Sequence, residues 1–307
     1  MKTQVSKLHH YNPLWRVPVT WRTTYSWDRV KLTPVMQRIL RHAAQTGILD
    51  EASRTTTRAL EARGLCNEGR LTREGRVVAI SLCDLQKQCE LLVLPLNVWC
   101  LTKARKPELA VMTAMSQSQS SCRVAYCEGG AIMLLLYCLC FERLYQLGKK
   151  HWGNAQVAQS FMYTSIMCYS YLLDEHPDLP ELMVADIANT EEQAMIRAFD
   201  ILKNWQGSRD GWAFQDWVGV DREFVQELFR ALGNARCAAI ARRFLEDPYA
   251  YSKGWPDLVW VDDSRIGLIE VKTIDRFRPS QIITIPEMRE VADLQVEVTR
   301  VRWRDAG

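Results

Sequence analysis

The chain has 307 residues, of which 48% are hydrophobic and 24% are charged. This composition excludes a disordered or collagen-like chain and is sufficient for a globular protein of one or two domains. The longest apolar run, Ala131–Phe141, is too short to span a bilayer, so we expect a buried helix there and no membrane partner.

Cysteine and histidine spacings argue against a zinc site. The ten cysteines include no Cys-x-x-Cys pair, and the five histidines show no His-Glu-x-x-His spacing. No apolar leader is visible at the start of the sequence. We therefore expect reduced cysteines and a cytoplasmic protein.

The net charge of +3 is unevenly distributed. Residues 1–80 contain 14 Lys and Arg against 6 Asp and Glu, which leaves the remainder net negative. A basic end joined to an acidic remainder fits a polyanion-binding module next to a site that gathers carboxylates, although chance produces the same asymmetry. Residues 1–30 interleave tryptophans with arginines, which predicts an extended arm that contacts nucleic acid or packs onto a neighbouring domain.

Residues 31–82 predict two helices followed by a hairpin. Thr33 and Pro34 are typical of a helix start and Gly47 of its end. A second helix runs to Gly64, and Asn67-Glu68-Gly69 forms a turn. This order resembles a winged helix-turn-helix domain. The resemblance implies DNA contacts on the second helix and the wing, or else a winged helix used only for protein contacts. The implied DNA contacts are Arg54, Thr55 and Arg58 on the helix, with Arg70, Arg73 and Arg76 on the wing.

The rest of the chain divides into two further regions. Residues 83–220 are predicted to be mostly helical, and residues 221–307 to form a small α/β unit. The expected helices are Ala131–Leu144, Ala155–Leu173, Thr190–Trp205, Arg222–Leu232, Ala235–Leu245 and Pro286–Ala292. The expected strands are Leu258–Val261, Ile266–Val271 and Val296–Val301.

Three charged residues in the last region form a spaced motif. Asp257 follows Pro256 at the start of one predicted strand, and Glu270 and Lys272 lie two apart on the next. Residues two apart on a strand leave the same face, and neighbouring strands lie roughly 5 Å apart. Asp257 and Glu270 can therefore converge on one Mg²⁺ or Mn²⁺, with the backbone carbonyl of Val271 as a further ligand.

Pro-Asp and Glu-x-Lys, taken separately, are both common by chance. A Glu-x-Lys on a surface strand is usually a solvated ion pair. Here the neighbours Leu268, Ile269 and Val271 are apolar, so the charged pair interrupts a buried strand. Burial of two charges costs several kcal/mol unless partners or a metal compensate. Lys272 is then placed to orient the attacking water or to offset charge that develops on phosphate oxygens.

The run G-W-P-D-L, then E-V-K, D-R and S-Q, resembles the VRR-NUC family of PD-(D/E)xK nucleases over about Leu228 to Val301. Asp275, Arg276, Ser280 and Gln281 match the later part, whereas Phe277 and the extra residues before the serine depart from it. The resemblance implies an α/β nuclease core with a mixed sheet flanked by helices. It also implies Mg²⁺ or Mn²⁺, a DNA substrate, a catalytic Gln281 and a DNA-binding Arg276.

A third carboxylate is expected from a helix. Cys127-Glu128-Gly129-Gly130 before an apolar run resembles a segment of the Fanconi-anaemia-associated nucleases, which carry the same module. That resemblance implies Glu128 as a catalytic and metal-binding residue. The alternatives are Glu223 and Glu227, because compact VRR-NUC proteins take this glutamate from just before the PD strand.

The sequence thus favours a metal-dependent DNA endonuclease or exonuclease, either general or structure-selective for flaps or junctions, in repair, phage replication or defence. It would act as a monomer or homodimer. One alternative is a nonspecific antibacterial toxin-type DNase with an immunity protein as partner. Another is a winged-helix regulator with an inactive nuclease remnant, which the presence of Asp257, Glu270 and Lys272 together disfavours.

Overall fold

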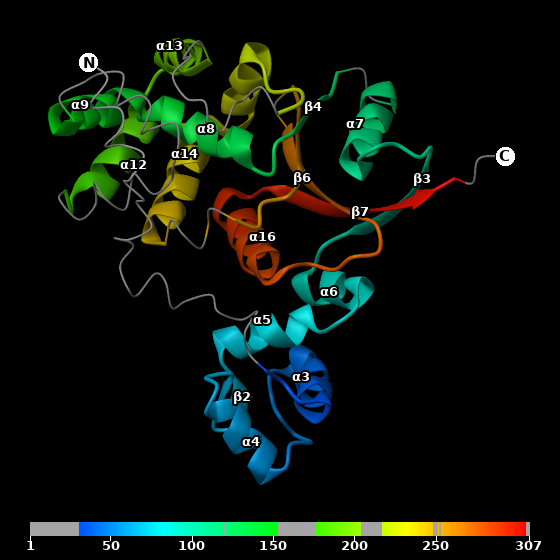
Figure 1. Ribbon diagram of the computed structural model, residues 1–307. Helices are drawn as coiled ribbons and strands as arrows, with labels where there is room; N and C mark the ends of the chain where they lie inside the picture. The colour runs from blue at the N-terminus through cyan, green and yellow to red at the C-terminus, as the bar shows by residue number, and fades with distance from the viewer. Residues whose placement is uncertain are drawn as a thin grey trace, which may run out of the picture.

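A five-stranded mixed sheet organises the computed structural model of the chain (Figure 1). The structure describes residues 31–118, 121–152, 176–203, 217–247, 251, 253–263 and 265–304. The arm expected over residues 1–30 and the helix expected over Ala155–Leu173 lie outside the described residues.

The strands follow the order β3 (Leu96–Leu101), β7 (Gln295–Trp303), β6 (Arg265–Lys272), β5 (Leu258–Asp262) and β4 (Arg123–Tyr126). The first three are mutually parallel, whereas β6, β5 and β4 pair antiparallel. The sheet confirms the three predicted strands. It also takes β3 and β4 from the region predicted to be mostly helical, because runs of six and four residues are too short for periodicity to distinguish strand from helix.

Helices cover both faces of the sheet. Helix α7 (Pro107–Ser118) packs on one face, where Val111 and Met115 join a cluster with residues of β4, β5 and β6. The other face is covered by α8 (Gly130–Leu139), α14 (Arg222–Glu246) and α16 (Pro279–Ala292).

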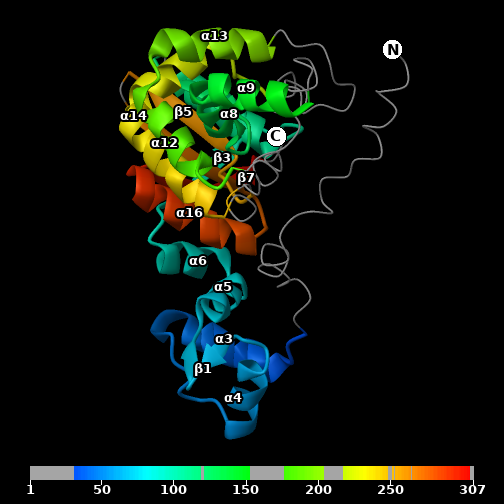
Figure 2. The same ribbon diagram turned by 90° about the vertical axis from the view of Figure 1, so that its left-hand side faces the viewer.

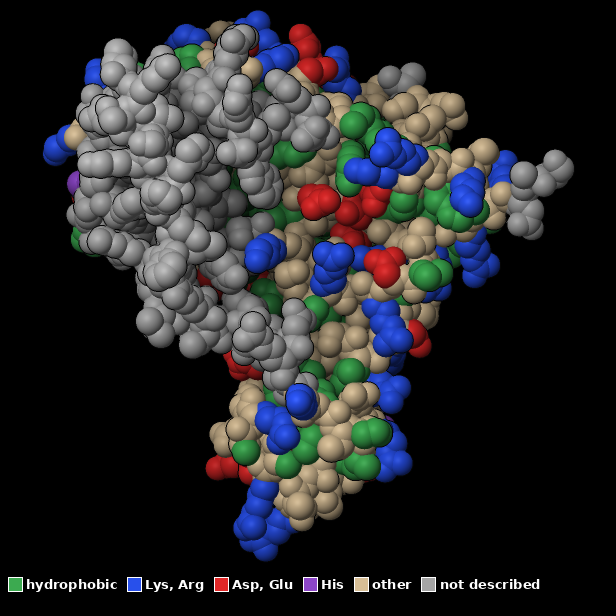
Figure 3. All heavy atoms as spheres, viewed as in Figure 1, with side chains coloured by type: hydrophobic (Ala, Val, Ile, Leu, Met, Phe, Trp, Pro, Cys, Tyr) green, Lys and Arg blue, Asp and Glu red, His purple; other side chains and the backbone are tan. Residues whose placement is uncertain are grey.

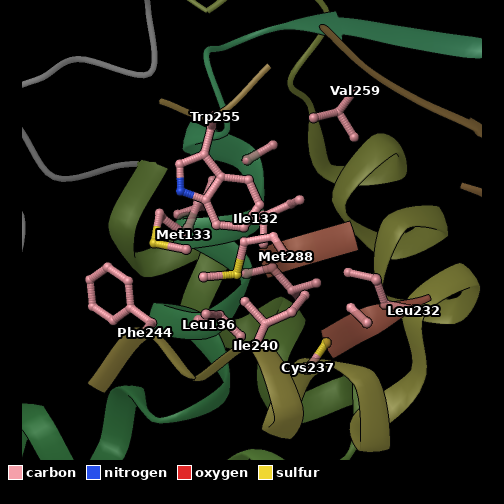
Figure 4. Close-up of a cluster of buried hydrophobic side chains, with 14 of the residues drawn as sticks. Ile132, Met133, Leu136, Leu232, Cys237, Ile240, Phe244, Trp255, Val259 and Met288 are labelled. Carbon is pink, nitrogen blue, oxygen red and sulfur yellow. The ribbon is translucent and has the colours of Figure 1, made fainter. Parts of the chain in front are cut away.

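Figure 4 shows how this second layer is packed. Ile132 of α8, Ile240 of α14 and Met288 of α16 converge beneath the indole ring of Trp255. Helix α14 breaks its helical geometry at Gly233, where φ is 69°, so the two predicted helices are confirmed as two segments around this glycine. Helix α16 begins earlier than predicted, at Pro279 instead of Pro286.

Three further helices, α9 (Phe141–Trp152), α12 (Leu179–Asn189) and α13 (Glu192–Lys203), surround α8 and α14. Among the described helices, none is by itself long and apolar enough to cross a membrane. Helix α8 and the first part of α9 pass that test of length and composition only when joined, although they are bent by 72° relative to each other.

Residues 31–92 form a second unit, the N-terminal lobe, below the sheet in Figures 1 and 2. It has its own hydrophobic cluster around Leu40 and Leu60. The predicted start of its first helix is confirmed, since the Thr33 hydroxyl accepts from the amide of Met36. Its elements are α3 (Pro34–Thr46), α4 (Arg54–Glu61), β1 (Cys66–Asn67), β2 (Arg70–Leu71), α5 (Arg73–Ser81) and α6 (Leu85–Leu92).

One placement in the lobe was wrong. Arg73 and Arg76 were expected on the wing, but they lie on α5. The hydroxyl of Thr72 accepts from the amide of Gly75 and caps this helix, so the hairpin ends at Leu71. The Arg73 guanidinium reaches across to Glu287 of α16 at 2.9 Å.

Gly254 fixes the approach of the Pro256-Asp257 turn to α16. Its φ is +82°, and a Cβ at this position would lie 2.3 Å from the carbonyl oxygen of Ser280. A side chain therefore has neither the backbone freedom nor the space that this position requires.

We expect Gly254→Ala to lower the free energy of unfolding by about 3 kcal/mol, the sum of left-handed strain and overpacking against backbone. Gly64→Ala is the matched control. Gly64 has a φ of +70° but nothing within 4 Å of an added Cβ, so it should lose only about 1 kcal/mol. Chemical denaturation measures both, and equal losses would contradict the close approach.

Candidate active site

Asp257 and Glu270 are brought together by the register of β5 and β6. Leu258 pairs with Ile269, so the next step along this antiparallel ladder sets Asp257 opposite Glu270. The Asp257 carboxylate accepts from the amide of Val271 at 2.8 Å, which turns it toward β6. Glu270 is 1% exposed. The convergence predicted from the sequence is therefore present.

Lys272 lies at the centre of a buried polar network. Its Nζ donates to Glu270 Oε1 at 2.7 Å, to Asp275 Oδ2 at 3.1 Å and to Gln281 Oε1 at 3.2 Å. Gln281 in turn donates to Glu270. The network joins the end of β6 to Gln281 in the first turn of α16.

Burial shifts the pKa values of the ionisable groups at this site. It raises the pKa of Asp257 to about 8, and the neighbouring Glu270 adds to the increase. Burial also raises the pKa of Glu270 to about 7, against the opposing effect of the Lys272 ammonium. For Lys272 itself burial acts to lower the pKa, but Glu270 and Asp275 outweigh it and the pKa is raised. The Lys272 ammonium alone does not balance two ionised carboxyl groups. Ionisation of both therefore requires additional positive charge nearby.

The turn between β4 and α8 carries Glu128 to the same place. The amides of Cys127 and Glu128 both reach the carbonyl oxygen of Asp257 at 3.2 Å. Glu128 has a φ of +47° and an exposed side chain. Left-handed backbone at a non-glycine residue is uncommon and is found at functional sites. At Gly129, an added Cβ would lie 2.3 Å from the Trp255 side chain, so this residue requires glycine.

The two alternative glutamates lie elsewhere. Glu227 pairs with Arg123 at 3.1 Å. Arg123 is opposite Val261, at the far end of β4 from Asp257. Glu223 is exposed at the start of α14, beside Asp221, which also pairs with Arg123. Of the three candidates, the structure brings Glu128 to Asp257.

Sequence reasoning missed the residues at the rim beside α7. Tyr126 lies two residues before Glu128 and pairs with Leu258, next to Asp257. Burial and the negative charge of Glu108 raise the pKa of Tyr126, and Glu108 also acts on Asp257. The Nζ of Lys106 lies 4.9 Å from the Tyr126 ring centroid. Tyr126 lies on β4, a strand that was not predicted, and only its position two residues before Glu128 pointed to the site.

Figure 3 shows acidic side chains gathered near β6 and α7, with Lys and Arg side chains around them. Among the described residues, no group of three His, Cys, Asp or Glu side chains is already arranged as a metal site. One oxygen of Glu270 is occupied by Lys272 and Gln281, while its Oε2 is buried and has no hydrogen-bond partner among the described residues.

The basic residues predicted to contact DNA fall into two groups. Arg54, Thr55 and Arg58 are exposed on α4, and Arg70 is exposed on β2. Their positions leave them accessible to a ligand. Arg276 is exposed but donates to the carbonyl of Leu82 in the lobe, at 3.2 Å.

Residues 191–303 match the family model described as the VRR-NUC domain. The fold is similar to paFAN1 bound to 2-nucleotide 5′-flap DNA with a gap, at a TM-score of 0.56 and 17% identity over 89% of this chain and 49% of that chain. For the complex with a 1-nucleotide 5′ flap, the TM-score is 0.55 and the identity 18%, over 90% and 51% of the chains.

This chain spans about half the length of those solved structures. A search of curated protein sequences found no match. The matched segment holds Asp257, Glu270 and Lys272 in the order of the motif, with Asp257 opposite Glu270 and Lys272 paired to Glu270. Residues 191–303 are therefore similar to the VRR-NUC domain, and the motif residues lie within that match.

Proposed function

We propose that this chain is a divalent-metal-dependent DNA nuclease that hydrolyses phosphodiester bonds at the site around Asp257, Glu270 and Lys272. The observation that carries the proposal is a half-buried carboxyl group, that of Asp257, opposite the buried carboxyl group of Glu270 and beside one ammonium. Such an arrangement is costly for a scaffold alone. The VRR-NUC match over residues 191–303 supports the same activity.

The residues present fit a hard divalent cation. Asp257, Glu270 and Glu128 offer carboxylate oxygens. The Oε2 of Glu270, which has no hydrogen-bond partner among the described residues, is available to coordinate a metal ion. The carbonyl of Val271 points to the same side of β6 as its amide, which binds Asp257. We assign these four residues to Mg²⁺ or Mn²⁺. When bound, such an ion neutralises charge on the phosphate and makes water a stronger nucleophile.

Lys272 acts as a fixed positive charge. Its raised pKa keeps the ammonium protonated at neutral pH, so it donates hydrogen bonds and does not remove a proton. Gln281 and Asp275 hold the ammonium from two sides. In this position it stabilises negative charge that develops on phosphate oxygens during attack.

DNA is the substrate that this arrangement fits best. The exposed Arg54, Arg58 and Arg70 supply phosphate contacts from the lobe. Two solved structures that are similar in fold are complexes of paFAN1 with gapped 5′-flap DNA, which supports selectivity for a branched or gapped DNA structure. The basic lobe and the acidic site would then contact different parts of one DNA molecule.

We expect Asp257→Ala and Lys272→Ala each to reduce cleavage at least about 100-fold in Mg²⁺ or Mn²⁺, because each removes a group that stabilises the transition state. DNA affinity should change little. Cleavage is measured on single strands, duplex, 5′ flaps, 3′ flaps and four-way junctions. Glu290→Ala, an exposed acid on α16, is the control and should cut like wild type. Near-normal cutting by Asp257→Ala would refute the assigned site.

Metal binding can be tested without cleavage. Mn²⁺ should raise the melting temperature of the wild-type protein, because a ligand that binds only the folded state stabilises it. Glu128→Gln should weaken the apparent Mn²⁺ affinity in this titration, whereas Glu227→Gln should not. A reversed result would assign the third carboxylate to α14.

The lobe is tested by salt dependence. Replacement of Arg54, Arg58 and Arg70 together by Ala should weaken duplex binding and make the slope of log K against log salt shallower by about 2 to 3, since each lost phosphate contact removes about 0.9. Arg197→Ala, an exposed arginine on α13, should leave the slope unchanged. If the triple variant keeps the wild-type slope, these arginines do not bind DNA.

A further inference from the structure

Gln88 of α6 is a polar side chain on an apolar helix face, and it is 0% exposed. Both ends of its amide are used. Its Nε2 donates to the carbonyl of Ile80 at 3.1 Å, within the N-terminal lobe. Its Oε1 accepts from the backbone amide of Phe277 at 2.8 Å. This one side chain therefore connects the lobe to the loop that follows Lys272.

That loop leads directly into the Lys272 network. The Phe277 ring centroid lies 5.7 Å from the Nζ of Lys272. The next amide, that of Arg278, donates at 3.0 Å to the Gln281 oxygen that also accepts from Lys272. Two successive backbone amides are thus fixed, one by Gln88 and one by Gln281. Displacement of the first moves the aromatic ring and shifts the second.

Buried apolar residues of α5 and α6, among them Ile80, Leu85 and Leu92, also pack into the core beneath the sheet, but two other polar contacts between the lobe and this region are more exposed. Arg73 pairs with Glu287 across side chains that are 57% and 30% exposed. Arg276 reaches the Leu82 carbonyl from an exposed position. Exposed pairs stabilise weakly and tolerate movement, whereas a buried amide with both ends bonded fixes position and costs about 1–3 kcal/mol for each partner left unsatisfied.

We propose that Gln88 is a positioning residue through which the N-terminal lobe fixes Phe277 and, with Gln281, the ammonium of Lys272. The lobe is then a structural part of the catalytic apparatus as well as a surface for DNA. The inference rests on the proposed nuclease function. Reacting groups displaced by about 1 Å lose roughly 100-fold in rate, so loss of this contact affects turnover more than binding.

The test is Gln88→Met, which keeps the length of the side chain and removes both hydrogen bonds. Gln86→Met is the matched control, because Gln86 is exposed on the same helix. We expect Gln88→Met to lower kcat roughly 10- to 100-fold while Kd for DNA, measured in Ca²⁺, changes less than about twofold. Gln86→Met should match wild type in both. Equal loss of kcat and affinity, or no loss of either, would overturn the proposal.

Two further measurements separate positioning from general stability. Gln88→Glu keeps an acceptor for the Phe277 amide and should retain more kcat than Gln88→Met. Hydrogen exchange of peptides covering residues 273–278 should quicken in Gln88→Met and not in Gln86→Met, whether or not DNA is cleaved. Unchanged exchange would disprove the contact itself. Quickened exchange in a protein that cuts no DNA in Mg²⁺ or Mn²⁺ would reject the nuclease function and leave the contact intact.

Discussion

The site depends on one cross-strand register. Because Leu258 pairs with Ile269, Asp257 and Glu270 stand opposite each other at the end of two antiparallel strands. A slip of one residue would turn one of them to the other face of the sheet, where α7 packs. Buried apolar residues on both faces hold this register, so the hydrophobic core sets the geometry of the acidic pair.

The surroundings compensate for the cost of that pair in different ways. Lys272 and Gln281 bind one oxygen of Glu270, and the Val271 amide binds Asp257. The other oxygen of Glu270 remains unsatisfied among the described residues. The turn beside this pair is tightly packed. Glu128 adopts a left-handed backbone conformation, and Gly129 lies against the Trp255 side chain. Backbone strain at Glu128 and the unpaired oxygen of Glu270 lie close together, as is typical of sites that bind a ligand.

The sequence predicted the local part of this design and missed the long-range part. The strands around Asp257 and Glu270, the two segments of α14 and the cap at Thr33 follow from periodicity and from residues with strong local preferences. Strands β3 and β4 are short and gain their partners from distant segments, so local pattern favoured neither. Gln88 had a weak signal, since Leu85, Cys89 and Leu92 place it on the buried side of α6, but its partner Phe277 could not be read from the sequence.

The topology also constrains how the protein assembles. Strand β3 pairs, among the described residues, only with β7, and Leu96 meets Val298 across that ladder. During synthesis β3 therefore cannot form this pairing until β7, Gln295–Trp303, has been translated. Such high contact order slows folding. Completion of the sheet is thus a late event, and the acidic pair gains its full framework only after translation of the segment that ends in β7.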